Sequence, residues 1–214
     1  MFAGGGTVDV ARVNAAVVAA RAIRLGVTPE ELAYDLMLEG DGRNNLYVTL
    51  CNYEHGSLDS SLDMMRHPGA VLGLGDGGAH CGTICDGSYP TFMLTHWVRD
   101  RTRGERLPLP LVVQWLSHDT ARAVGLQDRG IIAPGYRADL NLFDPARLRL
   151  HAPQVVHDLP SGGRRLVQRA DGYAATVVGG TVVYRDGLPT GALPGRLVRG
   201  PQVAPSPARS TLRH

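Results

Sequence analysis

The stretch from residue 46 to residue 74 constrains the fold of this chain more than any other. Residues 46–50 (LYVTL) are rich in strand-forming side chains, and residues 70–74 (AVLGL) form a short apolar run typical of a buried strand. Between them, Ser57 precedes a helical spacing of apolar residues, which ends at His67-Pro68. A strand, a helix and a second strand in about 30 residues predict a βαβ unit with parallel strands and a right-handed crossover. Because a parallel pair is buried on both faces, we expect more protein on each side of it.

Helices are predicted on both sides of this unit. Apolar residues at steps of three and four predict a helix over residues 7–25, which Gly26 ends. Thr28-Pro29-Glu30-Glu31 has the pattern of a capping box and predicts a second helix that ends at Gly40. Further on, a helix is expected over residues 90–103, and another opens at Pro108 and continues into a short capped turn at residues 117–125.

The pattern changes to β structure after Gly130. We expect a strand at Ile131-Ile132, a turn at Pro134-Gly135 and an alternating strand at residues 138–143. Residues 176–178 and 181–183 predict a hairpin across Gly179-Gly180. From Gly195 the chain is rich in Pro, Ser and Arg without periodicity, which predicts a disordered tail over residues 195–214. The fold class is therefore α/β, followed by a small β portion.

Composition excludes several classes of partner. With 22 basic and 20 acidic residues among 214, the formal net charge is +2, so we expect no nucleic-acid partner. There is no apolar run of about 18 residues, so we expect no membrane span, and the first seven residues lack the basic start of a signal peptide. Three cysteines, Cys51, Cys81 and Cys85, form no CxxC pair. Together these features predict a cytoplasmic protein without a disulfide scaffold.

The Gly-rich segment Gly73–His80 (GLGDGGAH) holds the main candidate for chemistry. Asp76 follows a predicted buried strand, and the ends of such strands carry catalytic and binding groups in barrels and doubly wound sheets. Alternatively, Asp76 is a turn residue that caps the next segment. His80, Cys81 and Cys85 are residue types that bind zinc, but the sequence shows no fourth ligand beside them. No His-x-His, HExxH or GxSxG motif occurs in the chain.

Four segments together resemble the C-terminal part of the amidohydrolase superfamily. They are Gly73–His80, Leu116–Leu126 (LSHDTARAVGL), Asp128–Leu140 (DRGIIAPGYRADL) with Phe143-Asp144, and Val177–Val183 (VVGGTVV) with Asp186-Gly187. The third segment contains the pattern GxIxPGxxADL, which is specific to the superfamily. The Gly-Asp-Gly-Gly-Ala-His run and the segment from Pro90 to Arg103 are similar to those of the N-acyl-D-amino-acid deacylase (D-aminoacylase) group.

The resemblance implies a fold and a chemistry. It implies that residues 1–127 are the last strands and helices of a metal-dependent TIM barrel, with residues 46–52 and 70–75 as its seventh and eighth strands. Residues 128–194 would then be part of a small β-sandwich. The family's aspartate at the end of the last barrel strand matches Asp76, which implies that Asp76 is a general base beside zinc and also a ligand of the metal. The implied substrate is a small N-acyl amino acid, whose carbon–nitrogen (non-peptide) amide bond is hydrolysed.

Other metal ligands of that family have no counterpart in this sequence. Its His-x-His pair, its bridging residue and its two further histidines belong to strands that precede the matched region. We therefore expect this chain to need the missing N-terminal barrel portion as a partner, and to be inactive alone. Two alternatives stay open, namely a non-catalytic remnant or interaction module, and a cyclic-amide hydrolase of the dihydroorotase or hydantoinase kind with the same aspartate.

Overall fold

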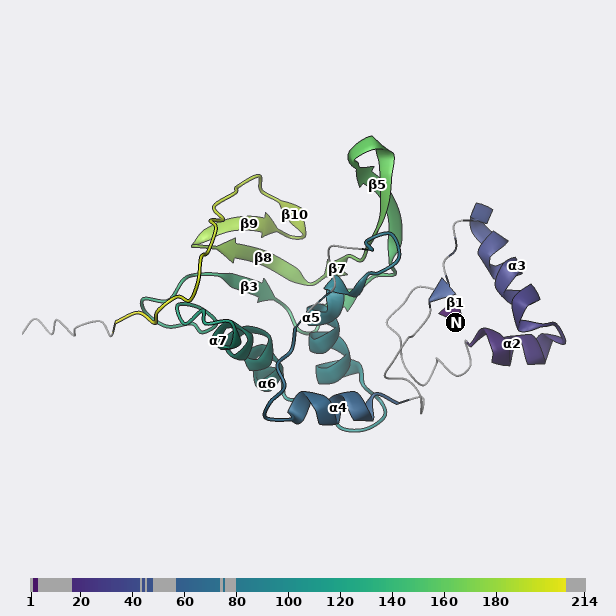
Figure 1. The fold of residues 1–214 in the computed structure, drawn as a ribbon, viewed down its shortest axis with the longest axis horizontal. Coiled ribbons are helices and arrows are strands. Elements are labelled where there is room, and N and C mark those ends of the chain that lie inside the picture. Colours follow the sequence, from purple (N-terminus) through teal and green to yellow (C-terminus); the bar gives the residue numbers. More distant parts are fainter. Residues whose placement is uncertain are drawn as a thin grey trace, which may run out of the picture.

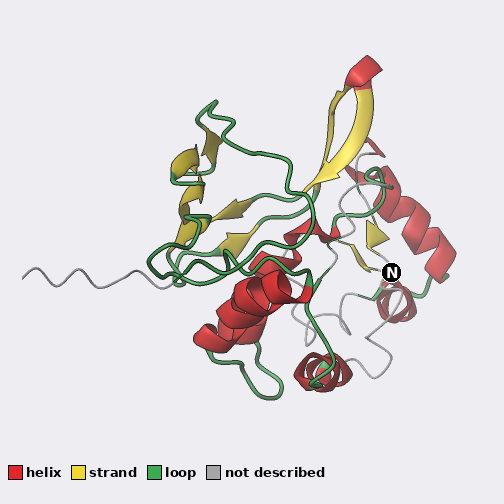
Figure 2. Ribbon diagram, turned by 60° about the vertical axis from the view of Figure 1, so that its left-hand side comes forward, coloured by secondary structure: helices red, strands yellow, loops and turns green. Residues whose placement is uncertain are grey.

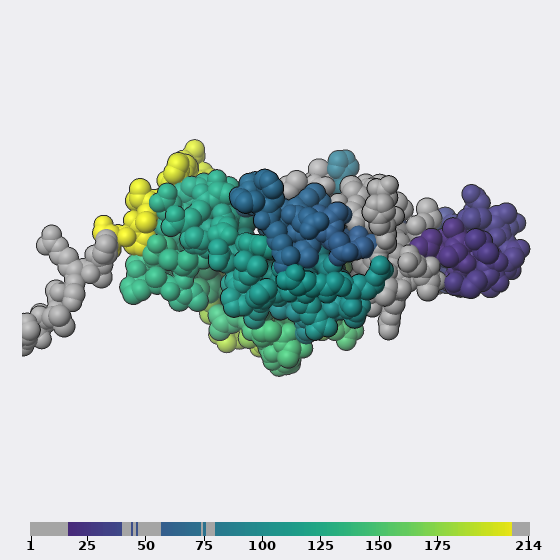
Figure 3. All heavy atoms as spheres, turned by 90° about the horizontal axis from the view of Figure 1, so that it is seen from below, coloured from purple at the N-terminus to yellow at the C-terminus, as the bar shows by residue number. Residues whose placement is uncertain are grey.

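The computed structural model describes residues 2–3, 17–42, 44, 46–47, 57–73, 75 and 80–206. A helical hairpin, α2 and α3, lies at one end of the molecule (Figure 1). Helices α4 to α7 form one layer of the remainder, and strands β3 to β10 lie beyond them (Figure 1). In the space-filling view of Figure 3, the helical hairpin and the C-terminal segment occupy opposite ends of the molecule.

Local capping signals set the bounds of the helical hairpin. Helix α2 spans Val18–Leu25 and ends at Gly26, whose φ of 70° is left-handed, as predicted for this glycine. Helix α3 spans Pro29–Gly42 and therefore continues two residues beyond the predicted end at Gly40. The seam between the two helices buries Val18, Ala22, Leu32 and Leu36. Of the helix predicted over residues 7–25, residues 7–16 lie outside the described part.

The capping box predicted at Thr28 is formed. The backbone N–H of Thr28 donates to Glu31 Oε2 at 2.9 Å, and the N–H of Glu31 donates to Thr28 Oγ1 at 3.2 Å. The first of these bonds, followed by the bond from the Thr28 hydroxyl, lowers the pKa of the Glu31 carboxyl. Because this pKa is lower in the folded state, the stabilisation is present at neutral pH and is lost as the pH falls through the lowered value.

The two strands predicted to pair in parallel do not do so within the described part. Strand β2, Leu46–Tyr47, pairs antiparallel with β1, Phe2–Ala3, so Tyr47 faces Phe2 in the register. Residues 70–73 belong to no strand. Instead, Leu72 packs against the helical core, which satisfies an apolar run without sheet pairing. The prediction of a parallel βαβ unit is thus wrong for these residues, and residues 48–50 and 74 lie outside the described part.

The helical layer consists of α4 and of a run of helical elements from residue 86 to residue 123 that one connection, residues 101–108, interrupts. Its elements are α4 (Asp59–Arg66), the 3₁₀ turn η1 (Asp86–Ser88), α5 (Tyr89–Phe92), the π-helix η2 (Met93–Asp100), α6 (Leu109–Gln114), the π-helix η3 (Trp115–Asp119) and α7 (Thr120–Ala123). The helix expected over residues 90–103 ends three residues early, at Asp100. There the N–H of Arg101 bonds to the carbonyl of His96 at 2.9 Å, and the backbone turns to an extended conformation.

Arg101, the first residue after this end, is anchored by its side chain. The side chain is 3% exposed, its guanidinium lies 4.5 Å from the Trp97 ring centroid, and it pairs with Asp59 of α4. It therefore ties the end of η2 to α4.

One hydrophobic core holds the helical layer to the β portion. Its buried members come from α4 and the residue before it, from η2, from α6 and the connection before it, and from the segment before β4. They are Leu58, Leu62, Met93, Leu94, Trp97, Leu107, Val112 and Leu148. Burying one such leucine contributes roughly 1.5–3 kcal/mol. Arg99 reinforces the contact with the β portion, because its guanidinium donates to the carbonyls of Pro145 at 2.6 Å and Leu148 at 2.9 Å.

The β portion consists of antiparallel pairs. A four-stranded sheet has the order β10-β9-β8-β3, and smaller pairs join β4 with β7 and β5 with β6. The strands are β3 (Leu140–Phe143), β4 (Arg149–Leu150), β5 (Gln154–Leu159), β6 (Gly163–Val167), β7 (Ala170–Asp171), β8 (Tyr173–Val178), β9 (Thr181–Arg185) and β10 (Leu188–Pro189). The β5–β6 pair projects from the body as an arm (Figure 2).

Two of the three strand features predicted here are confirmed. The hairpin across Gly179-Gly180 joins β8 to β9, and the strand expected at residues 138–143 forms as β3. Ile131-Ile132 forms no strand, because the chain is turning toward Pro134-Gly135 and Ile132 is 90% exposed, with no neighbouring strand.

Part of the predicted tail makes backbone contacts. Gln202 forms a parallel bridge with Leu126, and its N–H donates to the carbonyl of Gly125 at 2.9 Å. Residues 195–206 otherwise have no regular secondary structure. No helix in the described ranges is long and apolar enough to span a membrane.

We expect Thr28→Ala to destabilise the start of α3 by about 1 kcal/mol, because it removes a helix cap. Amide hydrogen exchange of residues 30–36 measures the change, and about a fivefold loss of protection is expected. Thr102→Ala, at an exposed position outside the helices, is the matched control. Equal protection in both variants would show that the capping box does not hold this helix end.

Candidate functional site

Asp76, the predicted catalytic residue, lies outside the described residues, together with residues 77–79. The structure describes the chain on both sides of it, at Gly73 and Gly75 before and from His80 onward. These flanking residues are the parts of the candidate site that the structure describes.

Gly75 places the start of the Asp76 segment against the beginning of the helical layer. A Cβ on Gly75 would lie 2.9 Å from the Cα of Gly87 and 3.4 Å from the Tyr89 ring. Such an approach of two backbones is possible because neither residue has a side chain. Gly87 belongs to η1, which leads into α5, so Asp76 follows directly from a contact that the buried core supports.

The residues after the Asp76 segment form a compact turn. His80 has a φ of 57° and is exposed, and its carbonyl accepts the N–H groups of Thr83 at 2.8 Å and Ile84 at 3.0 Å. A left-handed histidine is uncommon, and here the two bonds to its own carbonyl stabilise it.

Strand β6 and the residue after it fasten this turn to the β portion. The N–H of Leu166 donates to the carbonyl of Cys81 at 2.7 Å. Ser88 Oγ donates to Gln168 Oε1 at 2.5 Å, and Gln168 Nε2 donates to the carbonyl of His151 at 2.8 Å. The loop after Asp76 is therefore held between η1 and β6.

The three residues considered as zinc ligands do not form a site. Within the ranges that the structure describes, no group of three or more His, Cys, Asp or Glu side chains is arranged to hold a metal ion. Burial and then the charge of Asp86 raise the pKa of the Cys85 thiol, so this cysteine is less available as the thiolate that binds metals. The described residues thus do not fit zinc by themselves.

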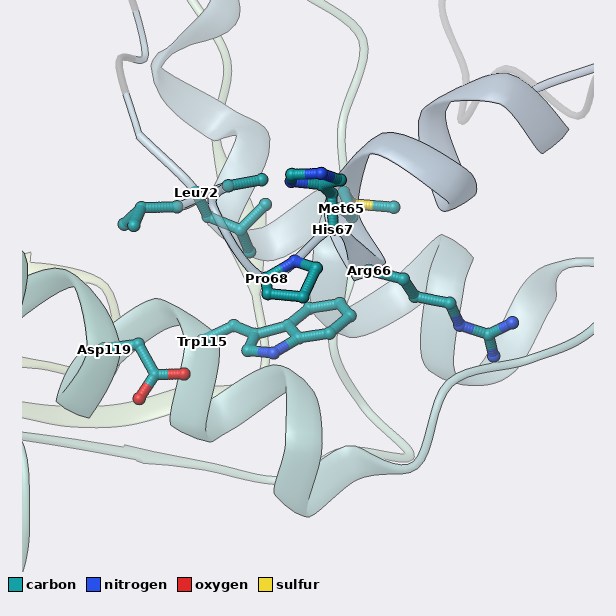
Figure 4. A pocket seen from close by; sticks show the side chains of 9 residues that line it. Met65, Arg66, His67, Pro68, Leu72, Trp115 and Asp119 are labelled. Carbon is teal, nitrogen blue, oxygen red and sulfur yellow. The ribbon is translucent and has the colours of Figure 1, made fainter.

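A pocket of about 200 Å³ lies between the end of α4 and η3 (Figure 4). It is lined by Met65, Arg66, His67, Pro68, Ala70, Val71, Leu72, Trp115 and Asp119. Pro68 lies over the Trp115 indole, with Arg66 and Asp119 to either side (Figure 4). Both charged groups are already paired, Arg66 with Glu105 at 2.6 Å and Asp119 with His118 at 2.8 Å. The pocket is lined by residues on both sides of the Gly-rich segment in the chain, and the carboxylate and guanidinium in its lining are both paired.

The segment Leu116–Leu126 has a structural network at its centre. Arg122 Nε donates to His118 Nε2 at 2.8 Å, and His118 Nδ1 lies 2.8 Å from Asp119 Oδ1. Because Nε2 accepts a hydrogen bond, Nδ1 carries the proton and donates it to the carboxylate. Gly130 packs on the backbone of His118, where a Cβ would lie 2.9 Å from the His118 Cα. The network thus joins η3 and α7 to the start of the GxIxPGxxADL pattern.

Asp139 of that pattern also has a structural role. Its Oδ1 accepts the N–H of Gly179 at 2.7 Å, and its Oδ2 accepts from Arg129 at 3.1 Å. The carboxylate thereby ties the turn of the β8–β9 hairpin to the loop before β3. The sequence pattern contains this aspartate without indicating its role, because nothing local to it points to the hairpin forty residues away.

The chain matches the amidohydrolase family over residues 10–184, which include Asp76, the Arg122 network and the GxIxPGxxADL pattern. No curated protein and no solved structure matches it. Because the family match spans most of the chain, this protein belongs to the amidohydrolase family, and its domain is that of a hydrolase.

We expect Gly75→Ala to lower the free energy of unfolding by about 1–3 kcal/mol, since its methyl group would overlap the Gly87 backbone. Gly73→Ala is the control, because nothing lies within 4 Å of a Cβ at that position, and it should leave stability unchanged or raise it by up to about 1 kcal/mol. Urea denaturation measures both. If the two variants unfold alike, the contact between the two loops does not support the segment that leads to Asp76.

Proposed function

We propose that this chain is the C-terminal part of a metal-dependent hydrolase that removes the acyl group from N-acyl-D-amino acids. The family match over residues 10–184 is the observation that carries the proposal. The Gly-Asp-Gly-Gly-Ala-His run and the segment from Pro90 to Arg103, which are similar to the D-aminoacylase group, support the substrate class.

In this proposal Asp76 is the general base. Its carboxylate accepts a proton from the attacking water as the oxygen bonds to the scissile carbonyl carbon. The proton then passes to the amide nitrogen as the carbon–nitrogen bond breaks, which releases a carboxylic acid and a free amino acid. The Gly75–Gly87 contact supports this role, because it anchors the residue before Asp76 to the helical core.

We propose zinc as the cofactor, with one residue of its site, Asp76, supplied by this chain. When bound, zinc lowers the pKa of a water and polarises a carbonyl. The sequence holds no His-x-His pair, and the described residues form no metal cluster. We therefore propose that the remaining metal ligands come from an N-terminal barrel portion like that of the family. This portion would be the partner of the chain, in the cytoplasm.

A non-catalytic interaction module is the second candidate. The lack of a metal cluster among the described residues favours it. It predicts a folded chain that binds a partner without hydrolysing any amide.

We expect Asp76→Asn to lower the rate of hydrolysis of N-acetyl-D-leucine by about 10²–10⁴-fold, because the amide cannot accept the proton. The measurement is release of the free amine by the complete polypeptide that carries this sequence, supplied with zinc. Asp35→Asn makes the same change at an exposed position of α3 and should have no effect.

The substrate panel separates the candidates. N-acetyl-L-leucine tests stereochemistry, and dihydroorotate tests the cyclic-amide alternative. Full activity in Asp76→Asn would contradict the role of Asp76, and a wild-type protein that hydrolyses none of the three substrates would favour the interaction module.

A further inference from the structure

Helix α3 carries apolar side chains on two faces, and the helical hairpin buries only one of them. Leu32 and Leu36, one turn apart, lie in the buried seam against α2. Tyr34, Met37 and Leu38 also follow the spacing i, i+3 and i+4, which places them together on another face of the same helix. These three side chains are 61%, 42% and 54% exposed, and we call them the outer stripe of α3.

An exposed stripe of this kind indicates that α3 has a further contact. Single exposed apolar side chains are common, but a helix with apolar residues on opposite sides is normally covered on both. The hairpin lies at one end of the molecule (Figure 1, Figure 3), and its buried cluster shares no residue with the core of the helical layer in the described ranges. No described element of this chain buries the outer stripe.

The charge of α3 determines which kind of partner fits this stripe. The helix contains no basic residue and five acidic ones, Glu30, Glu31, Asp35, Glu39 and Asp41. Glu30 precedes Tyr34 by one helical turn and so lies at the end of the stripe. Acidic side chains repel the phosphates of nucleic acids and of anionic lipids, so those ligands do not fit. They attract a polypeptide with basic side chains.

A second copy of this chain fits less well. If α3 of one copy packed on α3 of another, acidic residues would face acidic residues across the contact. Helix α2 has no acidic residue and carries Arg21 and Arg24, but its eight residues offer two positive charges against five negative ones on α3. The charges therefore favour a different polypeptide as the partner.

We propose that the outer stripe of α3 binds a basic amphipathic helix of another protein chain. The apolar side chains of that helix pack on Tyr34, Met37 and Leu38, and its arginine or lysine side chains lie beside the carboxylates of α3. The outer stripe shares no residue with the segments that the proposed hydrolysis uses. This inference therefore goes beyond the proposed function and does not depend on it.

Two synthetic peptides test the proposal. The first has 14 residues, the length of α3, with leucine at helical steps of three and four and arginine elsewhere. The second has glutamate in place of every arginine. Isothermal titration calorimetry with the complete polypeptide that carries this sequence should show that the arginine peptide binds about tenfold or more tightly than the glutamate peptide. Added salt should reduce this preference, because it screens charges at the surface.

Matched variants locate the contact on α3. Met37→Gln and Leu38→Gln should each weaken binding of the arginine peptide about fivefold or more, because apolar contact is lost while glutamine still favours a helix. Met64→Gln makes the same change on α4, at a side chain that is 54% exposed, and should leave the affinity unchanged. Far-UV circular dichroism checks that each variant folds. Equal affinity in all three variants, or equal or absent binding of the two peptides by the wild type, would overturn the proposal.

Sedimentation velocity of the polypeptide without peptide tests the other occupant of the stripe. The expected result is the same oligomeric state in the wild type, in Leu38→Gln and in Met64→Gln. Self-association that Leu38→Gln abolishes and Met64→Gln retains would assign the stripe to a second copy, and would overturn the proposal of a different partner.

Discussion

Burial of one face of the π-helix η2 is the constraint on which the rest of the structure depends. Met93, Leu94 and Trp97 are each less than 8% exposed, and they contact helices on one side and Leu148 on the other. Because η2 follows η1 and α5 directly, its burial also fixes the turn at Asp86–Ser88. That turn is the surface against which Gly75 packs, so the core sets the position of the residue before Asp76. Gly75 is thus positioned by a helix that begins eighteen residues further along the chain, at Met93.

The candidate site combines parts of the chain that are distant in sequence. The Gly-rich segment supplies the proposed base, the helical layer supports it, and β6 holds the loop that follows through the bond between Leu166 and Cys81. The segments quoted for the family resemblance also contain structural ties, and Asp139 is the clearest of them, since it accepts a backbone N–H from the turn of the β8–β9 hairpin.

Features with a local cause could be predicted from the sequence. The capping box at Thr28, the stop at Gly26 and the hairpin at Gly179-Gly180 depend on residues within a few positions of one another. The parallel strand pair could not, because a short apolar run such as residues 70–74 is buried equally well by helices, as Leu72 is here. The site was only partly predictable for the same reason. The pattern of the Gly-rich segment predicts a candidate residue, Asp76, but the contact of Gly75 with Gly87 beside it depends on tertiary packing.

Native mass spectrometry of the polypeptide that carries this sequence, captured from its own cells, tests the central claim most directly. The claim is that this amidohydrolase-family chain works as part of a zinc hydrolase whose other metal ligands lie in a partner portion of the barrel. It predicts a mass well above 22.9 kDa, the mass of these 214 residues, with bound zinc that a chelator removes. A mass of 22.9 kDa without metal would contradict it, and would favour an interaction module that keeps the family's sequence pattern without its reaction.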